Sequence, residues 1–159
     1  MQQLDAITLK ALSAEMQALL GTAKVSKVQH PSAHEFLITF WGGPPRKTSE
    51  RESRDLLYIH LNPEAPFCVL TESWHRQETV LHTFNKPTSL CMLLRKHLNG
   101  ANLVSASTLP AERVLNFAFE NFNELGNRVQ LVLSLELMGK HSNMILYDEV
   151  QGLILAVAH

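Results

Sequence analysis

Residues 129–137 read VQLVLSLEL, and this stretch decides the fold class. Apolar side chains occupy every second position, which is the spacing of a β-strand with one buried face. The apolar row consists of Val129, Leu131, Leu133, Leu135 and Leu137, and the opposite row includes Gln130, Ser134 and Glu136. We therefore expect a sheet that packs one face against a core.

Similar alternation marks further strands on both sides of this stretch. Upstream, we predict strands at 34–41, 55–61, 67–70, 101–109 and 113–119. Downstream, 143–147 and 153–157 flank the segment DEVQG, which has the composition of a hairpin loop. The polar segment 42–54, which begins Gly-Gly-Pro-Pro, is predicted to be a surface loop.

Two segments carry the three- and four-residue spacing typical of helices. In 5–20, Asp5 is placed to cap the N-terminus and Gly21 is placed to end the helix. In 87–100, PTSLCMLLRKHLNG predicts a mostly buried helix with Pro87 in its first turn. No internal repeat is evident. The order of elements predicts an α+β fold of antiparallel, β-sandwich-like sheets with two main helices.

The composition is that of one globular domain. The 159 residues include 14 Lys and Arg against 15 Asp and Glu, and 45% are hydrophobic. No apolar run approaches the roughly 20 residues of a membrane-spanning helix, and no secretory signal is visible. Two cysteines cannot supply a disulfide framework, so we expect a cytoplasmic location. A net charge of −1 excludes a globally basic nucleic-acid coat but leaves room for a local basic face.

The usual catalytic and metal-binding patterns are missing from the sequence. The eight histidines show no HExxH pattern, and no cysteine pair has zinc-ligand spacing. No serine lies in a G-x-S-x-G elbow, and Cys91 lies in a leucine-rich segment typical of buried thiols. Gly42 and Gly43 lead to prolines instead of a phosphate-binding helix start. We therefore predict no enzyme activity, no cofactor and no metal.

The charge pattern singles out one basic stretch. No acid occurs between Glu78 and Glu112. This interval holds the cations Lys86, Arg95 and Lys96, with His82 and His97 nearby. Such cations either bind the phosphates of a nucleic acid or form the solvated face of a core helix, and the pattern leaves both interpretations open.

A second unusual segment is 138–143, which reads MGKHSN between two predicted strands. Four consecutive positions hold a cation, a titratable ring, a hydroxyl and an amide: Lys140, His141, Ser142 and Asn143. Such a loop can bind phosphate and ribose, or it can simply turn the chain with Gly139 at a positive φ.

These segments together resemble the N-terminal domain of the NFACT family, which includes bacterial fibronectin-binding protein A, RqcH factors and eukaryotic NEMF. The matching motifs occur in order along nearly the whole chain: Leu4 with Asp5, CMLLRKHLNG at 91–100, Glu112 with Arg113, the stretch 117–126, and LELMGKHSNMIL at 135–146. The resemblance implies that 1–159 is an NFACT N-terminal domain and a fragment of a longer multidomain protein. It also implies a fold similar to the N-terminal domain of formamidopyrimidine-DNA glycosylases.

The resemblance implies a noncatalytic role in ribosome-associated quality control. Family members bind the large ribosomal subunit with a stalled peptidyl-tRNA and promote template-free tailing of the nascent chain, with this domain contacting tRNA. The family's early aspartate falls on Asp5, and its Asp-Arg pair falls on Glu112 and Arg113, where glutamate replaces aspartate. With the two segments above, the expected RNA contacts are Asp5, Arg95, Lys96, Glu112, Arg113, Lys140, His141 and Asn143.

Plainer interpretations of these residues stay open at this point. Asp5 can be an ordinary helix cap, and Glu112 with Arg113 can be a surface ion pair of little energetic value. One family name suggests an alternative function, an adhesion module that binds fibronectin or fibrinogen. Glycosylase chemistry is not expected, because the chain begins Met1-Gln2 and lacks that enzyme's N-terminal proline and following glutamate.

Overall fold

The computed structural model describes residues 5–44, 54–72, 84 and 86–159. Leu4, Glu78, His82 and most of the predicted loop 42–54 lie outside the described residues. The described elements, in chain order, are α1 (Ala6–Leu20), β1 (Lys24–Ser32), β2 (Glu35–Trp41), β3 (Arg54–His60), β4 (Phe67–Glu72), α2 (Ser89–Leu98), β5 (Asn102–Thr108), β6 (Val114–Phe122), β7 (Arg128–Glu136), the 3₁₀ turn η2 (Gly139–His141), β8 (Asn143–Asp148) and β9 (Leu153–Val157).

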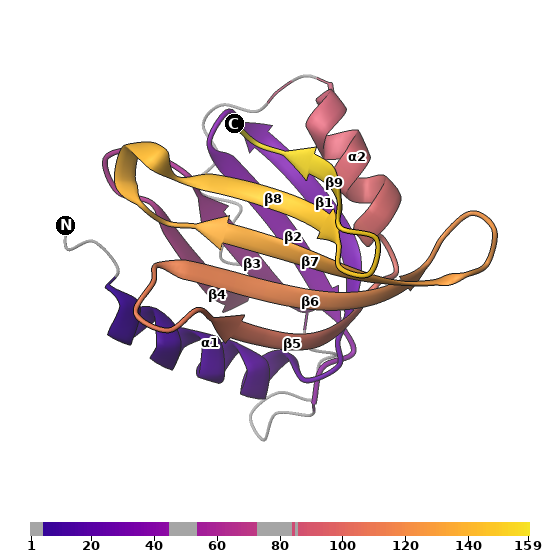
Figure 1. The fold of residues 1–159 in the computed structure, drawn as a ribbon, viewed down its shortest axis with the longest axis horizontal. Coiled ribbons are helices and arrows are strands. Elements are labelled where there is room, and N and C mark those ends of the chain that lie inside the picture. Colours follow the sequence, from indigo (N-terminus) through magenta and orange to yellow (C-terminus); the bar gives the residue numbers. More distant parts are fainter. Residues whose placement is uncertain (1–4, 45–53, 73–83, 85) are drawn as a thin grey trace.

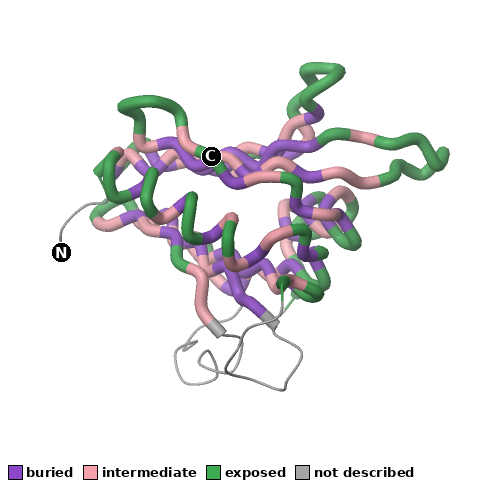
Figure 2. Tube along the Cα trace, turned by 90° about the horizontal axis from the view of Figure 1, so that it is seen from below, coloured by how far each residue is buried: buried purple, intermediate pink, exposed green. Residues whose placement is uncertain are grey.

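All described strands form one antiparallel sheet in the order β4-β3-β2-β1-β5-β6-β7-β8-β9 (Figure 1). The predicted α+β class, with antiparallel strands and two helices, is confirmed. Phe40 of β2 and Phe119 of β6 stack with ring centroids 6.3 Å apart, whereas three strand intervals in a flat sheet would separate them by about 14 Å. The sheet therefore folds over itself into two layers, and the predicted sandwich consists of one folded sheet (Figure 2).

The core lies between these layers. Leu131, Leu133, Leu135 and Leu137 are buried, as the alternation in β7 predicts. They pack in one cluster with Phe117 of β6 and with residues of the other layer and both helices. The strand that decides the fold class therefore supplies the centre of the core.

Both helices begin and end at side chains suited to those positions. The Thr8 N–H donates to Asp5 Oδ1 at 2.7 Å, and Gly21 ends α1 with a φ of 54°, as predicted. Helix α2 begins two residues later than expected, because Thr88 is its cap and accepts from the Cys91 N–H at 3.1 Å. Pro87 therefore precedes the cap instead of lying in the first turn.

The prediction that α2 is a mostly buried cylinder is wrong. Cys91 and Leu94 are buried, but Met92 is 61% and Leu93 40% exposed. The helix packs one side against the sheet (Figure 1), so Met92 and Leu93 on its other side stay in solvent.

Strand β1 corrects a second expectation, because the sequence predicts no strand between Gly21 and residue 34. The pairing of β1 with β2 shifts register twice, between Val25 and Lys27 and between Gln29 and Ser32. These irregularities break the two-residue alternation that identifies a strand in a sequence.

The fold contains an internal repeat that the sequence does not reveal. Each half is a helix followed by four antiparallel strands, α1 with β1–β4 and α2 with β5–β8. A constant offset of 78 residues relates the buried positions Met16 and Leu20 of α1 to Leu94 and Leu98 of α2. Few matched positions keep the same residue, which is why the repeat is hidden in the sequence.

The junction of the halves follows the same symmetry. The Val25 N–H donates to the Ala101 carbonyl, and the Leu103 N–H donates to the Ala23 carbonyl, both at 2.9 Å. Beyond this point β1 and β5 separate, since Lys24 opposite Asn102 is their one paired position. Each strand therefore has an edge that the other strand does not cover.

Each helix covers the edge that belongs to the other half. In α1, Gln17 accepts from the Ala106 N–H of β5 at 2.8 Å and donates to the Val104 carbonyl at 3.4 Å. At the position 78 residues later in α2, Arg95 Nε donates to the Val28 carbonyl of β1 at 2.9 Å. The two halves are therefore held together by exchanged helices.

Candidate nucleic-acid interface

The predicted RNA contacts fall into two groups at opposite ends of the sheet. The β5–β6 connection (109–113) and the β7–β8 connection (137–142) leave the same end, because antiparallel neighbours reverse direction. The N-terminus of α1 lies at this end as well (Figure 1). We call it the polar end, and it carries Asp5, Glu112, Arg113, Lys140, His141 and Asn143. Arg95 and Lys96 lie in the last turn of α2, beside the β6–β7 hairpin at the opposite end.

Asp5 is exposed, and its carboxylate already has a structural role as the cap of α1. The Thr8 backbone N–H donates to it, and this bond lowers the pKa of the Asp5 carboxyl below its usual value. The residue therefore presents a negative charge at the polar end, and the cap interpretation of Asp5 is confirmed.

Glu112 and Arg113 lie where the β5–β6 connection enters β6. Glu112 is exposed, and its backbone N–H donates to the Leu109 carbonyl at 3.2 Å. The preceding Ala111 has a φ of 59°, and it is the one described residue other than glycine in the left-handed region. Such strain often accompanies functional turns.

A backbone hydrogen bond joins the two motif segments of the polar end. The Leu137 N–H donates to the Arg113 carbonyl at 2.9 Å, so β6 begins directly beside the start of the β7–β8 connection. Arg113 itself is half-buried. The bond places the Glu112–Arg113 pair and the Lys140–His141 loop side by side.

The MGKHSN segment divides into residues that shape the loop and residues that face solvent. Gly139 has a φ of 63°, so the conformational interpretation of this glycine is confirmed. Ser142 is buried, donates to the Gly139 carbonyl at 2.6 Å and accepts from the Met138 N–H at 3.1 Å. Lys140 and His141 are exposed. The loop therefore presents a cation and an imidazole on a firmly held backbone.

Asn143 contacts the C-terminal residue of the chain. Its Oδ1 accepts from the His159 N–H at 3.0 Å, and its Nδ2 donates to the His159 carbonyl at 3.1 Å. These two bonds use the amide to position the residues that follow β9. An RNA contact through Asn143 would have to share these atoms.

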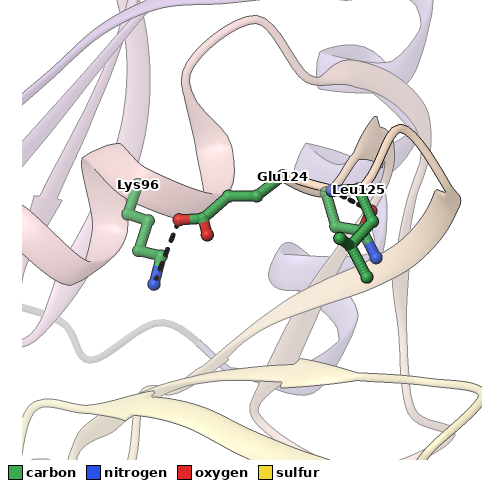
Figure 3. A network of polar contacts seen from close by, with 4 residues as sticks. Lys96, Glu124 and Leu125 are labelled. Atoms are coloured by element: carbon green, nitrogen blue, oxygen red, sulfur yellow. Dashed lines mark hydrogen bonds and ion pairs between the residues drawn. The ribbon is translucent and has the colours of Figure 1, made fainter.

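The basic stretch on α2 is occupied by internal contacts. Arg95 is half-buried and bonds to the Val28 carbonyl, as described above. Lys96 Nζ of α2 lies 3.6 Å from Oε1 of Glu124 in the β6–β7 hairpin (Figure 3). The Lys96 side chain is 56% exposed and the Glu124 side chain 84%. An exposed pair of this kind contributes at most about 1 kcal/mol. The pKa of His97 is lowered, mainly by burial and then by Lys96.

Two structural residues in these regions have no signal in the sequence. Gln17 accepts a hydrogen bond from the Ala106 N–H on the edge of β5 that β1 does not cover. Asn121 of β6 donates to the His97 carbonyl of α2 at 2.7 Å. Both contacts join residues far apart in the chain. A sequence pattern of three or four residues cannot reveal them.

The cysteines and the metal-ligating side chains are arranged as follows in the part of the chain that the structure describes. Cys68 and Cys91 are buried free thiols, and burial raises the pKa of Cys68 far above its usual value. Within the same residues, no three His, Cys, Asp or Glu side chains are placed to hold a metal ion, and neither helix is long and apolar enough to cross a membrane.

Comparison with known proteins identifies the family. A family model described as NFACT N-terminal and middle domains matches residues 5–159. The chain belongs to the NFACT family.

Two relatives of this NFACT chain carry the name Rqc2 homolog RqcH. The one from Streptococcus suis (strain 05ZYH33) is 33% identical over 158 residues, a match that covers 98% of this chain and 26% of the relative. The one from Bacillus subtilis (strain 168) is 28% identical over 129 residues, covering 77% of this chain and 22% of the relative. The chain thus spans about a quarter of the length of these relatives.

Two solved structures share the fold. The N-terminal domain of fibronectin-binding protein PavA from Streptococcus pneumoniae superposes with a TM-score of 0.81 at 28% identity, covering 98% of this chain and 53% of the other. The N-terminal part of the fibronectin/fibrinogen-binding protein from Streptococcus suis gives a TM-score of 0.82 at 27% identity, covering 99% of this chain and 54% of the other.

Proposed function

We propose that this NFACT domain is a noncatalytic module of a ribosome-associated quality control factor and that it contacts tRNA through its polar end. In the full-length protein it would act on large ribosomal subunits that hold a stalled peptidyl-tRNA and would support template-free tailing. The observation that carries the proposal is the hydrogen bond between Arg113 and Leu137, which brings the two motif segments together. Arginine and lysine there would position phosphates, and acceptors would meet ribose hydroxyls or base edges.

The polar end is the better candidate of the two cationic groups. Lys140 and His141 are exposed on a backbone held by Ser142, whereas Arg95 donates to a strand carbonyl and Lys96 faces Glu124. We expect Lys140 and Arg113 to contribute most to RNA affinity, with Asp5, Glu112, His141 and Asn143 around them. Arg95 and Lys96 would contribute as a separate, weaker group.

The test is the binding of fluorescently labelled tRNA to the chain at several salt concentrations. Affinity should fall as salt rises, because each phosphate that a cation neutralises releases counterions. Arg113→Lys keeps the charge but loses the planar fork, and we expect binding to be several-fold weaker in a variant that a melting curve shows to be folded. Lys140→Gln should weaken binding similarly, whereas Lys27→Gln, an exposed cation on β1, is the matched control. Affinity indifferent to salt, or an Arg113→Lys variant that binds like the parent, would contradict the proposal.

Fibronectin or fibrinogen binding is the second candidate, and the names of the two similar solved structures favour it. A surface for a matrix protein need not coincide with the polar end. Immobilised fibronectin should retain the chain if this candidate is right, and the retention should be the same for Arg113→Lys. Retention on fibronectin without any tRNA binding would replace the first candidate by the second.

We further propose that the chain is one part of a longer multidomain protein that acts in the cytoplasm, with contacts to the large subunit made mainly by other parts. The short coverage of the RqcH relatives supports this arrangement. The similarity of the fold to the N-terminal domain of formamidopyrimidine-DNA glycosylases stays a prediction, and no glycosylase activity is proposed.

A further inference from the structure

His30 of β1 lies at the N-terminus of α2, between aromatic rings and hydrogen-bonding groups. Its ring stacks on Phe36 of β2 with centroids 4.2 Å apart, and Phe84 meets it edge-on at 5.4 Å. His30 Nδ1 lies 2.7 Å from the Thr88 hydroxyl, and Nε2 lies 3.5 Å from the Ala33 carbonyl oxygen. His30 therefore connects β1 to the residue that caps α2.

These contacts define the protonation state of the ring. A carbonyl oxygen can only accept, so the hydrogen-bond network assigns the ring proton to Nε2 and leaves Nδ1 as an acceptor. The Thr88 hydroxyl then donates to His30 Nδ1, while the Thr88 oxygen accepts from the Cys91 N–H at 3.1 Å. This arrangement requires a neutral imidazole.

A proton on His30 Nδ1 would work against the cap of α2. Nδ1 would become a donor, so the Thr88 oxygen would have to accept from two N–H groups, and the hydroxyl proton would lose its acceptor. The new charge would also lie beside the positive end of the helix dipole, and the first turn of α2 contains no acidic residue. Protonation and an intact cap therefore oppose each other.

No neighbouring carboxylate in the described part of the chain compensates for this charge. Burial lowers the pKa of His30, and hydrogen bonds to the Ala33 and Ser32 backbones oppose that effect only in part. The Glu35 carboxylate accepts from the hydroxyls of Ser32 and Tyr58, both at 2.5 Å. The charged and titratable groups of the adjoining segments, none of which contributes to the pKa shift of His30, are His34, Glu35, Lys86 and Arg95.

A thiol lies directly behind the cap. Cys91 is the third residue of α2, its Sγ lies 3.8 Å from the Val28 carbonyl oxygen, and it is 1% exposed. Its backbone N–H is the group that Thr88 caps. Opening of the first turn of α2 would therefore expose this thiol. Cys68 of β4, which is 2% exposed, would stay covered.

We infer that His30 is a proton-operated latch: the neutral ring holds the first turn of α2 against β1, and binding of one proton at Nδ1 releases that turn and exposes Cys91. The latch acts within the folded chain and does not depend on RNA binding. Global unfolding would expose both cysteines, whereas release of the latch exposes Cys91 alone. The two thiols therefore distinguish the two events.

The test is thiol labelling of the full 159-residue chain with dithiodipyridine, which reacts with thiols even in mild acid. Mass spectrometry gives the labelling rates of Cys91 and Cys68 at about pH 7.5 and about pH 5.5. Their ratio cancels the general loss of thiolate on acidification. We expect the ratio of Cys91 to Cys68 to rise several-fold. The ceiling is about tenfold, because a released ring with the ordinary pKa of 6.5 is about ten times more often protonated than neutral at about pH 5.5.

His30→Gln removes the titrating ring, so its ratio should not change with pH. His97→Gln is the matched control, because His97 lies in the last turn of the same helix and burial lowers its pKa as well. This control should keep the rise of the parent. Melting curves at both pH values establish that each variant is folded, and the parent and His97→Gln profiles decide the question should His30→Gln not fold. A parent ratio that is the same at both pH values would overturn the inference, as would a rise that survives His30→Gln or disappears with His97→Gln.

Discussion

Arg95 and Lys96 are neighbours with opposite roles. The sequence suggests two solvated cations, but Arg95 Nε donates to the Val28 carbonyl while Lys96 faces solvent and Glu124. Arg95→Gln leaves a strand carbonyl without this donor, and we expect a loss of about 1 kcal/mol in the free energy of unfolding. Lys96→Gln should change it by under about 0.5 kcal/mol. Urea denaturation of both variants makes the comparison, and equal effects would contradict this assignment.

The difference between these two residues marks the limit of prediction at single positions. Local spacing predicts correctly that Asp5 caps α1 and that Gly139 turns the chain, because the partners lie within a few residues. The partner of Arg95 lies 67 residues away, and the partner of Gln17 lies 89 away. Candidate site residues can therefore be proposed from the sequence, but their contacts in the folded chain cannot be predicted from it.

The β7–β8 connection behaves as a unit built around one buried hydroxyl. Ser142→Ala removes the bonds to Met138 and Gly139 without altering any charge at the polar end. We expect a loss of about 1–2 kcal/mol in the free energy of unfolding. Because Lys140 and His141 would then be less firmly held, tRNA affinity should fall as well.

The measurements are urea denaturation and the salt-controlled tRNA titration, with Ser105→Ala on β5 as a control serine outside this loop. A Ser142→Ala variant that loses stability but binds tRNA like the parent would contradict the expectation that RNA binding needs an ordered loop.

Strands were predictable to the extent that their side chains alternate. Strands β2 to β9 lie within a few residues of the predicted ranges. Strand β1 is not predictable in this way, because its two register shifts remove the alternation of side chains. Its strand conformation depends on pairing with β2, which lies elsewhere in the sequence. The exposed side of α2 is also not predictable from local spacing. The sequence of a leucine-rich helix does not tell how many of its sides pack against the rest of the protein.

The whole molecule should lose stability on mild acidification. Burial lowers the pKa of His30, His60 and His97 below their ordinary value of 6.5. The unfolded chain therefore takes up protons on these rings at a higher pH than the folded chain does. As the pH falls through 6.5, protonation favours the unfolded chain, and the stability present above that pH is lost.

Urea midpoints at about pH 7.5 and about pH 5.5 check this expectation, which rests on histidine titration in that range. The midpoint should be lower at the acidic pH. His97→Gln should reduce the difference between the two midpoints, since it removes one of the three rings. A midpoint that rises on acidification would show that other groups dominate.

The exchanged helices also suggest how this domain could have evolved. Two copies of a shorter chain, each lending its helix to its partner, would form a symmetric domain-swapped dimer, and fusion of the two genes would produce the arrangement seen here. Phe40 and Phe119, which stack on each other, would then descend from one ancestral residue that met its own copy at the axis. Most of the polar end belongs to the second half, with Arg113 lying at the position that His34 occupies in the first. In such a history, the first copy would keep the scaffold while the second acquired the charges of the polar end.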